Sequence, residues 1–512
     1  MIKIKLISKL GLASLTALSL TLNAADNNKG INILLIVADD MNYNSVGAFG
    51  CPIPNTTPNI DKLASQGIRF TNAHVTSAVC QPSRGAIMTG MYGIHSGVEG
   101  FEHMTNNYRT LTEYLRKDGY LTGMLGKVGH SMPKFDTEHQ QFDLCKDQDE
   151  IGYGRDPQKY YESSKYLFMK SKNENKPFFL MANSHDPHRP FFGSDEEKKS
   201  SKFMEFSSKG LIPKPSKIFK PEEIVVPGFL PDIPEVRKEV AQYYSSVRRC
   251  DDTVGEILRA LKEAGLEENT LIIFISDNGM SFPYSKTNCY LNSTKTPFIA
   301  KWPGTIKSGI DATNFISGID FLPTFLEVAG IATPNGIDGK SFLPLLKGQQ
   351  QDGRDMVFTQ FYETSGSKRY PMRAIQNKYF GYIFNPWADG QKEFKNESQA
   401  GLTFKAMKEA AVQNNGIKQR VDFFLLRVVE EFYDFEKDPD ALHNLINNPT
   451  YADKINKMRN EMKSWMIKNN DPALTAFEQR NSKEALQKFM IDDEARTLQR
   501  RNIHSGILKK SK

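Results

Sequence analysis

The sequence predicts an α/β fold, with a large, mostly parallel central sheet flanked by helices and a smaller α+β C-terminal domain containing an antiparallel sheet. Three observations support this prediction. Apolar runs typical of buried strands alternate with helical segments along the first 350 residues. Polar or charged pairs come directly after four of these strands, and short mixed strand-like pieces replace the alternation after residue 350.

The N-terminus has the pattern of a secretory signal peptide, which we place at residues 1–25. Residues 1–9 carry three lysines and no acid, residues 10–22 are apolar or small, and Ala24 and Ala25 offer a cleavage site. An uncleaved anchor is the alternative, but this apolar stretch is shorter than the ~20 residues a spanning helix needs. We therefore expect an exported protein, periplasmic or secreted, without a stable membrane span.

Strands and helices alternate in the following segment. Residues 31–37 (INILLIV) form a continuous β-branched and leucine run, as expected for a strand covered on both faces. Thr57 and Pro58 then begin a helix that ends before Gly67. The same alternation predicts further strands at residues 68–75, 120–125, 177–184 and 271–276, and helices around residues 111–115 and 236–264.

The C-terminal part has a different sequence pattern. A polar break at residues 349–355 precedes strand-like pieces at residues 356–362, 372–377, 379–384 and 431–435. A helix around residues 451–469 carries a core stripe of Ile455, Met458, Met462 and Trp465. We therefore expect a large α/β domain at residues 26–350, a smaller α+β domain at 351–495 and a poorly ordered basic tail at 496–512.

Composition excludes several classes of protein. With 512 residues, of which 39% are hydrophobic, the chain is too long for one small module and apolar enough for a sizeable core. The formal charge of +6 falls to +3 without the three leader lysines, and Lys509, Lys510 and Lys512 account for the rest. Global charge therefore gives no indication of nucleic-acid binding. Five scattered cysteines do not form a disulfide framework or a clustered zinc site.

Polar side chains follow four predicted strands at the point where each strand ends. Ligands in parallel sheets bind beyond the carboxyl ends of the strands. One such pair is more often a helix cap or a turn, but four pairs at one edge predict a functional site. The pairs are Asp39 with Asp40, Lys127 with His130, His185 with Asp186, and Asp277 with Asn278.

The segment Cys80-Gln81-Pro82-Ser83-Arg84 points to chemistry rather than packing. A lone cysteine in an exported protein is by base rate a buried hydrophobe or half of a disulfide. Here Pro82 suits the first turn of a helix, which puts Cys80 at a helix N-terminus where backbone N–H groups favour an anion. Arg84, one turn later, projects a guanidinium toward the same place.

This Cys-x-Pro-Ser-Arg pattern resembles the signature of the type I, formylglycine-dependent sulfatases. The resemblance extends from Ile31 to about Pro472 and includes VADDMN, GYLTGMLGKVGH, SHDPH, SDNG and EFYDFEKDPDALHNL. It implies an alkaline-phosphatase-like fold. It also implies that Cys80 is converted to 3-oxoalanine (formylglycine) by a formylglycine-generating or anaerobic sulfatase-maturating enzyme, and that the hydrated aldehyde is the nucleophile.

A divalent metal is expected beside this nucleophile. Carboxylate and amide oxygens suit a hard cation, and Asp39, Asp40, Asp277 and Asn278 supply them. The resemblance implies Ca²⁺, with Mg²⁺ as the alternative, and adds an oxygen of the modified Cys80 as a ligand. The metal would act as Lewis acid and template.

The resemblance also assigns roles to the remaining polar residues. Arg84 and Lys127 would neutralise charge on the aldehyde hydrate and the sulfate. His130 would contact the hydrate. His185 and Lys286 match the positions that hold the leaving atom, with His185 preferred as proton donor because the ordinary histidine pKa lies closest to working pH.

Longer stretches resemble the heparan N-sulfatases (sulfamidases) in particular. They are residues 91–101, 177–189, 276–290 and 370–385. The implied reaction is hydrolysis of the S–N bond of a glucosamine N-sulfate in heparan- or heparin-type saccharides. His188, Arg189, Tyr370 and Arg373 are then candidate substrate contacts.

Departures from the family pattern keep other functions open. The spacing from Lys127 to His130 is one residue longer than in most sulfatases, and Lys286 replaces a sulfamidase arginine. The runner-up is an O-sulfatase acting on a glycosaminoglycan or another sulfated polysaccharide. A phosphate or phosphonate ester hydrolase of the same superfamily, and an exported glycan-binding protein in which Cys80 stays unmodified, are the alternatives from other classes. The sequence does not indicate an oligomeric state.

Overall fold

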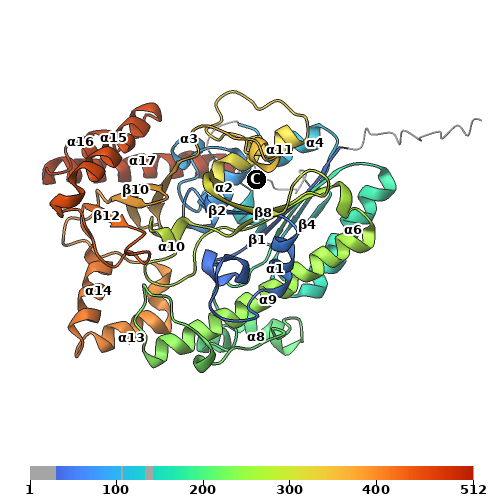
Figure 1. Cartoon of the computed structure of the whole chain (residues 1–512), viewed down its shortest axis with the longest axis horizontal. Coiled ribbons are helices and arrows are strands. Elements are labelled where there is room, and N and C mark those ends of the chain that lie inside the picture. Colours follow the sequence, from blue (N-terminus) through green and yellow to red (C-terminus); the bar gives the residue numbers. More distant parts are fainter. Residues whose placement is uncertain (1–29, 105–107, 133–141, 511–512) are drawn as a thin grey trace, which may run out of the picture.

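The computed structural model of the chain describes residues 30–104, 108–132 and 142–510 (Figure 1). The predicted signal peptide lies outside these residues. Within the described ranges, none of the helices combines the length and the apolar composition required to cross a bilayer.

Eight strands form the main sheet, in the order β4-β3-β5-β1-β6-β7-β2-β8. All neighbouring pairs are parallel except the two made by β7, which runs antiparallel to β6 and β2. The mostly parallel sheet is therefore confirmed. The strands are β1 Asn32–Ala38, β2 Ile68–His74, β3 Leu121–Leu125, β4 Leu144–Lys146, β5 Phe178–Asn183, β6 Thr270–Ser276, β7 Phe298–Lys301 and β8 Gly309–Ser317.

Helices cover both faces of this sheet (Figure 1). Strand β1 is buried along its whole length, and its alternate side chains enter two separate cores. Leu34 and Ile36 pack on the side of α1 (Pro58–Ser65), α6 (Pro157–Glu174) and α9 (Pro234–Ala264). Ile33 and Leu35 pack on the side of α2 (Cys80–Thr89), α4 (Leu111–Lys117) and α11 (Phe321–Val328). Coverage of both faces explains why the strand sequence is apolar without alternation.

A second sheet of four antiparallel strands lies at one end of the molecule, in the order β12-β11-β10-β9 (Figure 1). The expected helix is α15 (Ala452–Lys468), and its stripe is buried as predicted. β8 ends at Ser317 and β9 begins at Met356, so the proposed boundary at residue 350 falls between the two sheets. The strands are β9 Met356–Glu363, β10 Arg369–Asn377, β11 Phe380–Phe384 and β12 Glu430–Asp434.

The shorter helices connect these elements. They are α3 Gly93–Ser96, α5 Val128–Ser131, α7 Asp195–Lys199, α8 Ser201–Ser208, α10 Leu291–Thr294, α12 Leu343–Leu346, α13 Leu402–Ala410, α14 Asn415–Leu426 and α16 Leu474–Glu478.

The structure describes a helix, α17 (Lys483–Lys510), that continues through residue 495, where we expected a poorly ordered tail to begin. Arg500 forms ion pairs with Glu99 at 3.0 Å and Glu102 at 2.6 Å. Arg501 forms another with Glu363 at 2.8 Å. These partners lie far away in the sequence, so the local composition of the tail gives no sign of them.

Candidate active site

The four strands that end in polar pairs are neighbours in the main sheet, in the order β3-β5-β1-β6. Their carboxyl ends therefore meet at one edge, as predicted. The backbone N–H of Asp39 donates to the carbonyl of Asp186 over 3.2 Å, and that of Asp277 donates to Ala38 over 3.1 Å. One carboxylate oxygen from each of Asp39, Asp40 and Asp277 lies within 4.8 Å of the others, and all three residues are fully buried.

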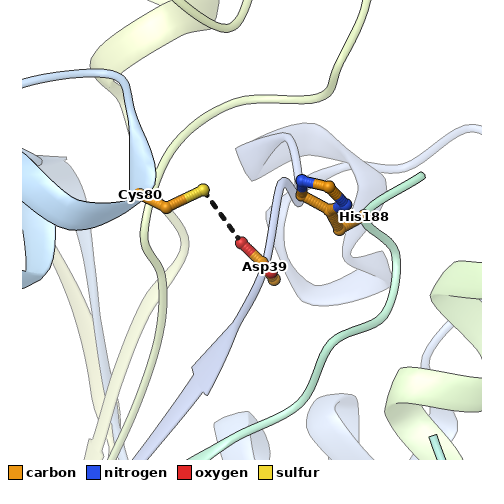
Figure 2. A group of neighbouring side chains, drawn as sticks. All are labelled: Asp39, Cys80 and His188. Atoms are coloured by element: carbon orange, nitrogen blue, oxygen red, sulfur yellow. Dashed lines mark hydrogen bonds between the residues drawn. The ribbon is translucent and has the colours of Figure 1, made fainter. Parts of the chain in front are cut away.

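Cys80 is the first residue of α2, which confirms the predicted helix N-terminus. Its Sγ lies 3.4 Å from Oδ1 of Asp39 and 4.0 Å from Oδ1 of Asp40. Figure 2 shows Cys80, Asp39 and His188 coming together from three segments of the chain. One possible metal-ligand atom of each residue lies within 4.8 Å of the other two. Burial, followed by the charge of Asp39, raises the pKa of the Cys80 thiol well above its ordinary value. An unmodified Cys80 is therefore a neutral thiol and a poor nucleophile.

Three cations, Arg84, Lys127 and Lys286, face the three carboxylates. Arg84 contacts Oδ2 of Asp277 through Nε at 3.0 Å and through a terminal nitrogen at 2.8 Å. Lys127 forms an ion pair with Asp39. Burial alone would raise the pKa of Asp39, but Lys127 and the other neighbouring cations hold it well below its ordinary value. The cluster is thus nearly charge-balanced, which is what a buried ionic site requires.

The donor set fits a hard divalent cation. Nδ2 of Asn278 donates to Oδ1 of Asp40 over 2.7 Å, whereas Oδ1 of Asn278 is buried without a hydrogen-bond partner among the described residues. Burial raises the pKa of Asp277 to about 8, and the charge of Asp39 adds to this. Burial likewise raises the pKa of Asp40 to about 6, although Lys286 opposes the shift. An orphaned amide oxygen beside crowded carboxylates is the arrangement that Ca²⁺ or Mg²⁺ would satisfy.

The two histidines of the SHDPH segment occupy different environments. Nε2 of His185 accepts a hydrogen bond from the backbone N–H of Lys127 over 3.1 Å, and the residue is 5% exposed. Nε2 of His188 instead lies 3.8 Å from Oδ2 of Asp40, and its side chain is 29% exposed. Burial, followed by the charge of Lys127, lowers the pKa of both rings well below the ordinary value. His188 is therefore the more exposed of the two rings, and the roles predicted for His185 and His188 stay predictions.

The other predicted contacts divide into two groups. His130 lies edge-on to Phe101 with ring centroids 5.3 Å apart, and burial with the charge of Lys127 lowers its pKa to about 3. The pKa of His130 is therefore influenced by the charged groups of the cluster. Three other candidates serve the fold: Arg189 pairs with Glu239 at 2.8 Å, Tyr370 donates to the carbonyl of Glu393 over 2.9 Å, and Arg373 pairs with Asp471 at 2.6 Å. A substrate contact by these three stays a prediction.

The sequence analysis did not identify Glu397, which pairs with Lys286 beside the cluster. Nζ of Lys286 lies 2.9 Å from Asp40 and 2.6 Å from Oε1 of Glu397, which comes from the C-terminal part of the chain. Glu397 lies in a polar stretch without a recognisable motif. Only the packing of that stretch against the loop after β6 brings it here.

Two protein families match parts of the chain. Residues 31–331 match the Sulfatase family, and residues 281–391 match the C-terminal domain family of N-sulphoglucosamine sulphohydrolase. The chain is 30% identical to human (Homo sapiens) N-sulphoglucosamine sulphohydrolase over 475 residues, which cover 87% of this chain and 91% of the relative. It is 31% identical to an ulvan-active sulfatase of Formosa agariphila over 449 residues, covering 85% and 80%.

A solved structure extends the likeness to the fold. The structure of a protein in complex with its substrate D-glucosamine-2-N,6-O-disulfate covers 87% of this chain and 99% of its own, with a TM-score of 0.64 at 20% identity. The family match spans more than half of the residues, and the human relative aligns over most of both chains. The chain therefore belongs to the sulfatase family and is a sulfuric ester or sulfamate hydrolase.

Proposed function

We propose that the protein removes sulfate from sulfated glycans, with the N-sulfate of glucosamine in heparan- or heparin-type saccharides as the leading substrate. The observation that carries this proposal is the position of Cys80 at a helix N-terminus, with Sγ 3.4 Å from Asp39 in a cluster of three buried carboxylates. The name of the human relative supports the choice of substrate.

Two groups complete the proposed site. The hydrated aldehyde formed from Cys80 would supply the attacking oxygen, and the raised pKa of the thiol supports the need for this conversion. A Ca²⁺ ion, or Mg²⁺, held by Asp39, Asp40, Asp277 and Asn278 together with residue 80 would supply Lewis-acid polarisation.

Residues of the chain perform the other steps. Arg84 and Lys127 place two positive charges beside residue 80 and would bind the non-bridging sulfate oxygens. His188 is the proposed proton donor to the leaving nitrogen or oxygen, because its ring is partly exposed and close to Asp40. Its neutral state in the free protein does not prevent this role, since a bound sulfate favours the imidazolium. Lys286 would bind the leaving atom beside His188.

A second substrate class is favoured by a specific observation. The ulvan-active sulfatase is as similar to this chain as the human relative is. An O-sulfatase acting on a glycosaminoglycan or another sulfated polysaccharide is therefore the second candidate.

The proposal includes export and maturation. The leader at residues 1–25 supports export to the periplasm or the medium, and the Cys80 segment supports modification by a formylglycine-generating or anaerobic sulfatase-maturating enzyme. We also retain the division into an α/β domain at 26–350 and an α+β domain at 351–495.

The deciding experiment is a panel of N-, 2-O-, 3-O- and 6-O-sulfated glucosamine and uronate saccharides assayed for released sulfate, with Cys80→Ala as the matched control. The proposal expects the N-sulfated saccharide to be turned over fastest. Preference for an O-sulfated saccharide would select the second candidate. Faster hydrolysis of an aryl phosphate than of the matching aryl sulfate would contradict both.

The state of Cys80 is tested by mass spectrometry of the peptide that contains it. Conversion of the thiol to the aldehyde lowers the mass by about 18 Da, by the stoichiometry of cysteine oxidation. An unmodified peptide from the natural host would favour a glycan-binding protein without turnover.

A further inference from the structure

Lys286 lies between two carboxylates, Asp40 and Glu397, that are far apart in the sequence. Its Nζ is 2.9 Å from Asp40 and 2.6 Å from Oε1 of Glu397. The Lys286 side chain is 1% exposed, and that of Glu397 is 25% exposed. A buried ammonium group requires a nearby anion. Lys286 has two, because Asp40 and Glu397 both pair with it.

The turn that carries Glu397 is fixed by contacts that do not involve Lys286. Nδ2 of Asn396 donates to Oγ1 of Thr287 over 2.5 Å, on the loop that also carries Lys286. Further along, the backbone N–H of Thr403 donates to the Glu239 carboxylate over 2.6 Å. Glu397 is therefore held beside Lys286 whether or not Lys286 pairs with Asp40.

Asp40 has two competing partners in the proposed site. The metal needs its carboxylate oxygens, and the same oxygens now pair with Lys286. A divalent cation at Asp40 would also repel the ammonium group a few ångströms away. Without a second anion, metal binding would leave a buried charge unpaired, which is costly.

We propose that Glu397 is a positioning residue that keeps Lys286 paired when the metal takes Asp40. This exchange lowers the free-energy cost of metal binding and keeps the ammonium group directed at the leaving atom of the substrate. The inference rests on the proposed metal site and adds a residue of the C-terminal part to the proposed active site.

The test is a double-mutant cycle read out by calorimetric Ca²⁺ titration of the mature protein. Glu397→Gln should weaken Ca²⁺ binding by about tenfold, the middle of the range for coupled charged pairs. The same substitution in a Lys286→Met background should have no effect, because no ammonium group is then left to pair. Glu393→Gln is the matched control, since Glu393 is an exposed glutamate of the same segment and should leave the affinity unchanged.

Turnover provides the second measurement. Glu397→Gln should lower kcat about tenfold with KM within about twofold, as expected for a group that acts on a transition-state contact. Glu397→Asp, which keeps the charge, should restore a large part of both losses.

The outcomes separate the inference from the proposed function. Equal Ca²⁺ affinity in the wild type and Glu397→Gln, or an equal loss with and without Lys286, overturns the inference and leaves the metal site standing. Failure of the wild type itself to bind Ca²⁺ or Mg²⁺ overturns both.

Discussion

The backbone N–H of Lys127 donates a hydrogen bond to Nε2 of His185 over 3.1 Å. This bond fixes the proton of the neutral ring on Nδ1 and occupies the lone pair of Nε2. A Cβ atom on Gly154 would lie 2.2 Å from Cδ2 of His185, so the ring fits tightly against the backbone there. His185 thus holds the loop after β3 to the loop after β5.

The two histidines should respond differently to the same change. We expect His188→Gln to lower kcat about 100-fold, the lower end of the range for proton transfer, without a change in the free energy of unfolding. His185→Gln should instead reduce the free energy of unfolding by about 1–3 kcal/mol, because a buried N–H loses its acceptor. Steady-state kinetics and chemical denaturation measure both effects. A stable His185→Gln protein without turnover would return the proton-donor role to His185.

Replacement of the nucleophile should separate activity from folding. Cys80→Ala is expected to abolish sulfate release, because no aldehyde can form. The fold should remain, since the deleted sulfur is one small buried group. Circular dichroism and a sulfate-release assay together check this expectation, and residual turnover above a reagent blank would refute the assignment of residue 80.

Removal of a proposed ligand should remove the metal. Asp277→Ala is expected to weaken Ca²⁺ binding by roughly 100-fold or more, since even groups that only orient ligands are worth 10- to 100-fold. Metal analysis of the purified protein and calorimetry test this. Asp195→Ala, at an exposed aspartate, is the control and should bind as the wild type does. Full metal occupancy in Asp277→Ala would count against the ligand set.

The burial of His74 leads us to expect that the stability of the protein depends on pH. The ring is buried, its Nδ1 lies 3.1 Å from Oγ1 of Thr294, and burial lowers its pKa to about 3. The folded protein therefore binds this proton less readily than the unfolded chain does. Its contribution is fully present above the ordinary histidine pKa of about 6.5 and is lost as the pH falls toward 3.

One such residue changes the free energy of unfolding by at most about 1.4 kcal/mol per pH unit. Urea denaturation at pH 7, 6, 5 and 4 should show a shallower acid loss for His74→Gln than for the wild type. Identical slopes for the two proteins would show that His74 does not titrate as proposed.

The last helix should contribute to global stability through Arg500. Its side chain is largely buried between Glu99 and Glu102, so Arg500→Ala removes the ion-pair partner of Glu102, whereas Glu99 keeps its contact with Arg369 at 2.8 Å. We expect a loss of about 2–4 kcal/mol in the free energy of unfolding. Gln499→Ala, on the exposed side of the same turn, should change it by less than about 0.5 kcal/mol. A loss below that size for Arg500→Ala would mean that α17 docks without these pairs.

Strand prediction succeeded where a strand is long and buried on both faces. β1, β5 and β6 are buried strands of seven, six and seven residues built around apolar runs, and a predicted polar pair follows each of them. β8 was not predicted, and its first six residues are exposed or half-buried. β4 and β7, with three and four residues, were not predicted either. A run that short has no periodicity of its own, and its pairing depends on neighbours that are distant in the chain.

The candidate site divides in the same way. Asp39, Asp277 and Cys80 could be found because each directly follows a strand or begins a helix. Glu397 could not, because nothing within its own segment distinguishes it from a surface glutamate. His188 was placed among the substrate contacts, yet spacing alone did not separate its role from that of His185.

The sequence by itself determined the chemical types at the site and the sheet edge at which they gather, since a strand end is a local property of the chain. The tertiary structure decided which imidazole faces Asp40, which carboxylates share Lys286, and that the last helix docks on Glu99 and Glu102. These pairings depend on distances between residues that are remote in sequence. Coulomb and hydrogen-bond energies fall steeply with distance, so only the folded chain selects the partner of each charge.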